Sequence, residues 1–103
     1  MASGTDSFAS GCASYAAGNY STAAGLWSRT NAANSFAVGA FNVGGGDPVN
    51  WVLTDPLFEV GNGTCTNGVI HSDALVIYKN GNATFQGSVS VAPGGDIPMF
   101  TGQ

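Results

Sequence analysis

Small and polar residues recur with a period of seven along the first half of the chain. Serine, alanine and glycine occupy alternate positions of each heptad, as in Ser7-Phe8-Ala9-Ser10-Gly11. Further copies begin at Ser14, Ser21, Ser28 and Ser35, and a degraded copy begins at Asn42. A fixed short period is typical of stacked structural units, so it predicts a building element rather than an enzyme.

The heptads do not fit a coiled coil. They lack the large apolar residues that a coiled coil needs at two heptad positions. A glycine in every second turn also costs a helix about 1 kcal/mol each. Residues at i, i+2 and i+4 instead share one face of a strand. Each heptad is therefore predicted to form a strand and a corner, and two heptads to form one coil of a flattened parallel β-solenoid.

The serine, alanine and glycine columns are predicted to face the interior of the coils. Two strand layers approach closely only where the side chains between them are small. The serine hydroxyls are expected to bind backbone groups at the corners. The predicted interior comprises Ser7, Ala9, Gly11, Ser14, Ala16, Gly18, Ser21, Ala23, Gly25, Ser35, Ala37 and Gly39.

Such an interior is too poor in apolar area to stabilise the chain alone. A buried methylene contributes roughly 0.8 kcal/mol, whereas ordering one residue costs on the order of 1–2 kcal/mol. One outward face is the more apolar, and the opposite face carries Arg29, the only arginine. The apolar face is predicted to pack against other copies of the chain. The predicted interface comprises Phe8, Thr22, Ala24, Phe36 and Val38.

A different pattern follows the repeats. The cluster Gly44-Gly45-Gly46-Asp47-Pro48 predicts their end. Alternation over 55–60 predicts one or two short strands, and 74–78 predicts another strand. Asn80-Gly81 predicts a tight hairpin turn into a return strand over 83–91. Trp51 is expected in the core of this second part.

The heptads, above all Asn34-Ser35-Phe36-Ala37-Val38-Gly39-Ala40, resemble the head repeats of trimeric autotransporter adhesins over about residues 2–46. Residues 55–64 and 74–82 are similar to a cap that follows such repeats in phage and bacterial fibres. The resemblance implies an all-β homotrimer of left-handed parallel β-rolls with a β-hairpin cap or neck. It implies a head over 1–46, a cap and hairpin leading to the shaft over 47–92, and a linker or the next module over 93–103.

Composition agrees with this class. The 103 residues include 16 glycines and only 8% charged residues, and the net charge is −4. No basic patch for nucleic acid is present, and no apolar run approaches the roughly 20 residues that span a bilayer. Neither nucleic acid nor direct membrane contact is therefore expected. The repeat begins in mid-motif behind Met1, so we expect an excised fragment of a longer protein.

Candidate chemistry is sparse. His71 is the only histidine, so the many serines do not indicate a Ser-His-Asp set, and we expect it to be an ordinary loop residue. The acidic residues are scattered, and no phosphate-binding glycine motif occurs. No catalytic residue, metal site or cofactor is predicted. Cys12 and Cys65 are expected to be free thiols.

Three aromatic residues fall at predicted corners. Trp27 and Phe41 share one corner column, two heptads apart, and are expected to stack, with Tyr20 at the opposite corner. Packing is the favoured interpretation of all three, since aromatic residues often pack at interfaces. They are also the candidate ligand-facing aromatics, because exposed rings stack on sugars.

These observations favour a non-enzymatic, structural segment of a homotrimeric fibre that supports attachment. The expected location is extracellular, on a bacterial cell surface or a phage virion. One alternative is a module that binds a cell-surface glycan or protein receptor directly. Another is an ice-binding solenoid. Such proteins usually display threonine at the same position of successive repeats, whereas here Thr22 stands between Phe8 and Phe36 at the equivalent positions.

Overall fold

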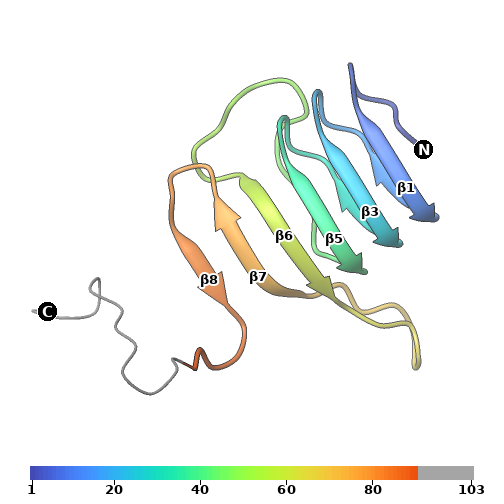
Figure 1. Cartoon of the computed structure of the whole chain (residues 1–103), viewed down its shortest axis with the longest axis vertical. Helices are drawn as coiled ribbons and strands as arrows, with labels where there is room; N and C mark the ends of the chain where they lie inside the picture. The colour runs from blue at the N-terminus through green and yellow to red at the C-terminus, as the bar shows by residue number, and fades with distance from the viewer. Residues whose placement is uncertain (91–103) are drawn as a thin grey trace, which may run out of the picture.

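A computed structural model describes residues 1–90 and shows an all-β arrangement without a helix among them (Figure 1). One sheet has the strand order β1-β3-β5-β6-β7-β8, and a second sheet pairs β2 with β4. Within the described part, no helix is long and apolar enough to cross a membrane. The strands are β1 (Phe8–Cys12), β2 (Tyr15–Ala16), β3 (Thr22–Leu26), β4 (Arg29–Thr30), β5 (Phe36–Ala40), β6 (Pro56–Asn62), β7 (Asp73–Tyr78) and β8 (Ala83–Phe85).

The repeats pair in parallel with a constant offset. Phe8 of β1 lies opposite Thr22 of β3, and Tyr15 of β2 lies opposite Arg29 of β4. In both sheets the partner comes two heptads later, as the repeat predicts. Each of the first two pairs of heptads contributes one strand to the long sheet and one short strand to the second sheet, whereas the third contributes only β5.

Serine hydroxyls bind the backbone at the corners, as expected. Ser21 Oγ donates to the Gly18 carbonyl at 2.7 Å, and Ser35 Oγ donates to the Ala32 carbonyl at 2.7 Å. Ser14 and Ser28 instead donate across to Gly25 and Gly39, at 3.0 and 3.1 Å. At Gly18 and Ala32 the hydroxyl bond adds to a longer bond of 3.3 Å from the backbone N–H of the same serine. The serine side chains thus reinforce the backbone hydrogen bonding at the corners.

The residue before each serine turns the chain through a left-handed conformation. Asp6, Ala13, Tyr20, Trp27, Asn34 and Phe41 recur at the heptad spacing and have φ between 47° and 63°. Asp and Asn tolerate this region, whereas other L-residues adopt it at a cost of roughly 1–2 kcal/mol. Four of the six corners therefore carry residues that are intrinsically unsuited to them.

The pattern changes after β5. Phe36 pairs with Phe58 of β6, which lies more than three heptads further along the chain, whereas earlier partners are two heptads apart. The connection between β5 and β6 is therefore longer than the connections between the earlier parallel strands. β6 is the last strand that pairs in parallel; β7 pairs antiparallel with β6, and β8 pairs antiparallel with β7. Gly81, with φ 92°, forms the turn between β7 and β8.

The predicted return strand over 83–91 is too long. β8 ends at Phe85, and the Gln86 N–H makes one further bond to the Ala74 carbonyl at 3.0 Å. β7 begins at Asp73, only two residues before Leu75, the partner of Phe85, so a return strand that continued to residue 91 would run past the end of β7. Residue 91 of this prediction, the end of the predicted cap at 91–92, and the predicted linker over 93–103 lie outside the described residues.

Candidate functional site

The outer side of the long sheet carries a row of large apolar side chains from most of its strands. Phe36 and Phe58 lie on neighbouring strands with ring centroids 5.9 Å apart. Ile77 pairs with Phe58, and Leu75 pairs with both Val60 and Phe85. Each of these residues is at least partly exposed. We call this surface the apolar face: Phe8, Thr22, Ala24, Phe36, Val38, Phe58, Val60, Leu75, Ile77 and Phe85.

All five residues of the predicted interface lie on the apolar face. Phe8 is 51% exposed and Phe36 is 42% exposed, which is unusual for phenylalanine on a sheet. Thr22, Ala24 and Val38 are partly exposed. The sequence interpretation ended at Val38, whereas the structure extends the same surface over β6, β7 and β8.

The predicted interior residues divide into two groups. Serine and alanine positions such as Ser21, Ala16, Ala23 and Ala37 are almost fully buried, and Gly18 is buried with them. Those at the N-terminal end, Ser7 and Ala9, are partly buried. The interior also includes Ser28 and Thr30, whose hydroxyl donates to Ser21 Oγ at 3.0 Å.

Gly11, Gly25 and Gly39 do not lie in the interior, contrary to the prediction. They are exposed and have φ of 100°, 123° and 94°. A Cβ on Gly25 would point at the carbonyl of Gly39 on the next strand, far inside van der Waals contact, rather than between the sheets. These positions therefore require glycine because neighbouring backbones approach closely and because φ is positive.

Of the three candidate ligand-facing aromatics, two are exposed and one is buried. The rings of Trp27 and Phe41 stack as predicted, with centroids 6.0 Å apart and planes 8° apart. Phe41 is 4% exposed because Trp27 covers one side and His71 lies 6.1 Å away on another, so it is not ligand-facing. Trp27 is 53% exposed, and Tyr20 is exposed at the other corner.

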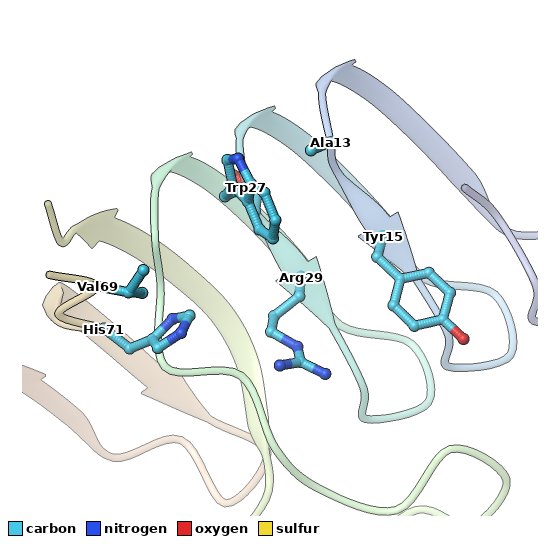
Figure 2. Close-up of a pocket in the computed structure, with 7 residues that line it drawn as sticks. Ala13, Tyr15, Trp27, Arg29, Val69 and His71 are labelled. Carbon is cyan, nitrogen blue, oxygen red and sulfur yellow. The ribbon is translucent and has the colours of Figure 1, made fainter. Parts of the chain in front are cut away.

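Trp27 borders a cleft of about 230 Å³ on the side of the short β2–β4 sheet (Figure 2). We call it the aromatic–basic cleft; its lining residues are Ala13, Tyr15, Trp27, Ser28, Arg29, Val69 and His71. Figure 2 shows the Arg29 side chain extending between Tyr15 on one side and His71 on the other. Within residues 1–90, neither aspartate nor glutamate lines this cleft.

Backbone contacts hold the two charged or titratable groups of the cleft in place. The Arg29 N–H donates to Asn42 Oδ1 at 2.7 Å, and its carbonyl accepts from Asn42 Nδ2 at 2.8 Å. These bonds use the backbone of Arg29 and leave its exposed guanidinium directed at solvent. His71 Nδ1 lies 3.1 Å from the Asn42 carbonyl, which only accepts, so Nδ1 carries the proton and Nε2 is the acceptor in the neutral ring.

Asn42 also closes the second sheet. It occupies the serine column, is fully buried, and its amide bonds the β4 backbone as another strand would. The same Nδ2 donates to Glu59 Oε2 at 2.9 Å, and the Gly44 N–H donates to Glu59 Oε1 at 3.0 Å. Glu59 is 2% exposed. Phe58 and Val60 point outward, so the alternation within β6 was the available signal that Glu59 faces inward.

Glu59 lies beside a second carboxyl group, Asp73, in a cleft of about 330 Å³ that His71 also lines. Burial raises the pKa of Glu59 to about 8, and both a hydrogen bond to Asp73 and the negative charge of Asp73 act in the same direction. The hydrogen bonds from Gly44 and Asn42 lower the pKa and partly oppose this shift. With its pKa raised to about 8, the Glu59 carboxyl is expected to be mainly protonated at neutral pH and to donate a hydrogen bond to Asp73. The two clefts flanking His71 thus differ in charge, one acidic and one basic.

Trp51 is not a core residue, contrary to the prediction. It is exposed, and the buried Lys79 places Nζ 4.8 Å from the centroid of its ring. Lys79 Nζ has no hydrogen-bond partner within residues 1–90; it contacts the face of the indole, and its charge also interacts with the Asp47 carboxylate. The long loop before β6 carries Trp51 to the surface, where the ring covers the lysine.

Cys12 and Cys65 are free and exposed, as expected. Across the described residues, no group of three or more His, Cys, Asp or Glu side chains is arranged to hold a metal ion. Asp47 accepts bonds from the backbones of Asn50 and Val49, which lower its pKa and order the loop before β6.

Comparison with protein-family models, with curated proteins and with solved structures finds no significant match for this chain.

Proposed function

We propose that the chain is a structural segment of a homotrimeric extracellular or virion fibre, in which the repeats form a left-handed parallel β-roll and β6–β8 form the cap. The fibre belongs to a bacterial cell surface or a phage virion and supports attachment. The proposed role is mechanical, and no reaction is assigned to it.

The observation that carries this proposal is the composition of the interior. Among residues 1–90, the buried apolar residues are Ala16, Ala23, Ala32, Ala33, Ala37 and Phe41. Five of these six are alanines, which bury little apolar area compared with leucine or phenylalanine. Several of the large apolar side chains, among them Phe8, Phe36 and Phe58, lie on the apolar face instead. Burial of that face against other copies supplies the hydrophobic stabilisation that the interior lacks.

The shape of the apolar face also supports self-association. Its side chains lie in register across neighbouring strands, as Phe36 and Phe58 show. A flat, continuous surface of this kind suits a partner with the same strand spacing. The resemblance of the heptads to the heads of trimeric adhesins supports three copies around a common axis.

The repeated backbone contacts suit a load-bearing element. Parallel pairing at every second heptad connects successive coils, and the close Gly25–Gly39 approach excludes side chains between them. Each coil is therefore packed directly on the next. A fibre segment built this way transmits force through backbone hydrogen bonds rather than through mobile side chains.

A charge placed on the apolar face tests the proposal. In Phe36→Asp, a buried carboxylate at the interface is expected to convert the trimer to monomers or to unfold it, as measured by sedimentation velocity and circular dichroism. Tyr20→Asp is the matched control, because Tyr20 is an exposed aromatic at a corner and is expected to leave the mass unchanged. An unchanged trimer in Phe36→Asp contradicts the proposed interface, and a monomeric wild type contradicts the assembly.

A further inference from the structure

We propose that the aromatic–basic cleft binds a carboxylate-bearing sugar residue, with Trp27 stacking on the ring and Arg29 pairing with the carboxylate. This site lies at the short β2–β4 sheet, away from the apolar face, and the inference does not rest on the proposed trimer. The proposed structural role gives this surface no function, and the inference assigns it a ligand.

The conformation of Trp27 is the first argument. A tryptophan with φ 52° costs more than the asparagine that occupies the equivalent corner at position 34. The strain does not serve burial, since the side chain is 53% exposed. Phe41 stacks on the indole with ring centroids 6.0 Å apart, so the ring is supported on one face while the side chain stays largely exposed. A rigid, exposed indole face is suited to stacking on the apolar face of a sugar ring.

The environment of Arg29 is the second argument. It is one of only two basic side chains in a chain of net charge −4, and no acidic residue of the described part lines its cleft. Its backbone is held by Asn42, while the guanidinium is free to bind a ligand. A guanidinium pairs with a planar carboxylate through two parallel hydrogen bonds. Charge complementarity therefore selects an anionic group at this position.

His71 and the size of the cleft narrow the ligand further. The Nδ1–H bond to Asn42 leaves Nε2 as an acceptor for a sugar hydroxyl. The volume of about 230 Å³ is smaller than the roughly 300–1,000 Å³ of pockets that enclose drug-sized ligands. It therefore suits a single terminal ring of a larger glycan. The acidic cleft of Glu59 and Asp73 on the other side of His71 disfavours an anion there.

A titration monitored by two-dimensional NMR of ¹⁵N-labelled protein tests this proposal. The probe is methyl β-D-glucuronide, and its neutral counterpart is methyl β-D-glucoside. Saturable shifts are expected at the Trp27 indole N–H and at the Arg29 and Asn42 amides. The glucuronide is expected to bind at least tenfold more tightly, which corresponds to about 1.4 kcal/mol. Equal affinity for the two sugars, or the absence of saturable shifts, overturns the proposal.

Three variants separate the roles of the residues. Arg29→Gln is expected to remove the preference for the glucuronide while keeping the backbone bonds to Asn42. Trp27→Asn suits the left-handed corner and is expected to fold but to lose binding of both sugars. Trp51→Phe is the control, because Trp51 is exposed but lies outside the cleft, and this variant is expected to bind both sugars as the wild type does. Wild-type affinity in Arg29→Gln contradicts the carboxylate contact.

Inorganic phosphate distinguishes a sugar site from a general anion site. It is expected to leave the Trp27 indole resonance unshifted at the glucuronide concentrations used, because it has no face to stack on the ring. If phosphate reproduces the glucuronide shifts at equal concentration and ionic strength, the cleft is a simple anion site and the proposal is wrong.

Discussion

The ring of Trp27 lies parallel to that of Phe41, with planes 8° apart, and both residues have a left-handed backbone conformation. They are two heptads apart, so the stack follows the coil spacing of the repeat. The same corner of the preceding coil carries Ala13, whose φ is 56°. One column of corners thus carries an alanine and two aromatic residues at sites that favour asparagine or glycine.

Relief of this strain is expected to stabilise the protein. Ala13→Asn replaces a residue that tolerates positive φ poorly with one that adopts it readily, and a gain of about 1 kcal/mol in the free energy of unfolding is expected. Urea denaturation at fixed protein concentration measures it. The converse change, Asn34→Ala, is expected to lose a similar amount. A destabilised Ala13→Asn variant contradicts the strain assigned to these corners.

Close backbone contact between neighbouring strands predicts a large effect at Gly25. In Gly25→Ala the new methyl group meets the Gly39 carbonyl, and φ of 123° disfavours any L-residue. A loss of roughly 3 kcal/mol is expected, from overpacking together with backbone strain. Gly87→Ala is the control, since no atom of the described chain lies within 4 Å of its Cβ position. The melting temperatures of the two variants are compared by thermal unfolding. Equal values contradict the claim that position 25 requires glycine.

Substitution of Asn42 is expected to lower the free energy of unfolding more than substitution of any other asparagine. Asn42→Ala removes both bonds to the Arg29 backbone and one bond to Glu59, all in a buried position. A loss of roughly 3 kcal/mol is expected, because buried groups are left unpaired. Asn31→Ala removes only an exposed bond to the Gly46 carbonyl at 3.1 Å, and a change below about 1 kcal/mol is expected. Similar urea midpoints for the two variants contradict the capping role of Asn42.

The buried Glu59–Asp73 pair predicts that stability falls as the pH rises. Glu59 keeps its proton up to about pH 8 in the folded chain, whereas its unperturbed pKa is 4.5. Between these values folding takes up a proton, so the free energy of unfolding decreases with increasing pH. The stabilisation is complete below about pH 4.5 and is lost on approaching pH 8.

Glu59→Gln isolates this effect. The amide cannot lose a proton, but it places an N–H₂ group where one of the two oxygens accepts from Asn42 or Gly44. The variant is therefore compared by its pH dependence, and its free energy of unfolding is expected to change less between pH 5 and pH 8 than that of the wild type. Urea midpoints at both pH values provide the comparison. The change in stability between pH 5 and pH 8 is compared between the two proteins. If the wild type gains stability over this range relative to Glu59→Gln, a neutral buried Glu59 is contradicted.

The repeat region was predictable because its period determines both the register and the corners. A spacing of seven places Phe8 opposite Thr22 and Trp27 beside Phe41, and small residues allow the layers to approach. The outward positions of Gly11, Gly25 and Gly39 were not predictable from alternation, since a positive φ breaks the alternation of a strand.

Features that depend on contacts between distant segments were missed. Glu59 is buried because Asn42 reaches it from the last heptad and Asp73 reaches it from the start of β7. Trp51 is exposed because the long loop brings it over Lys79. The aromatic–basic cleft combines the short sheet with the loop that carries Val69 and His71. No local pattern in the sequence encodes which loop meets which corner.

The mass of the protein in solution tests the central claim most directly. Light scattering coupled to size-exclusion chromatography is expected to give three times the chain mass of 10.3 kDa over a range of protein concentrations. A stable mass of one chain, with the fold retained by circular dichroism, would show that an interior of alanine and serine holds the fold without partners and would contradict the trimer.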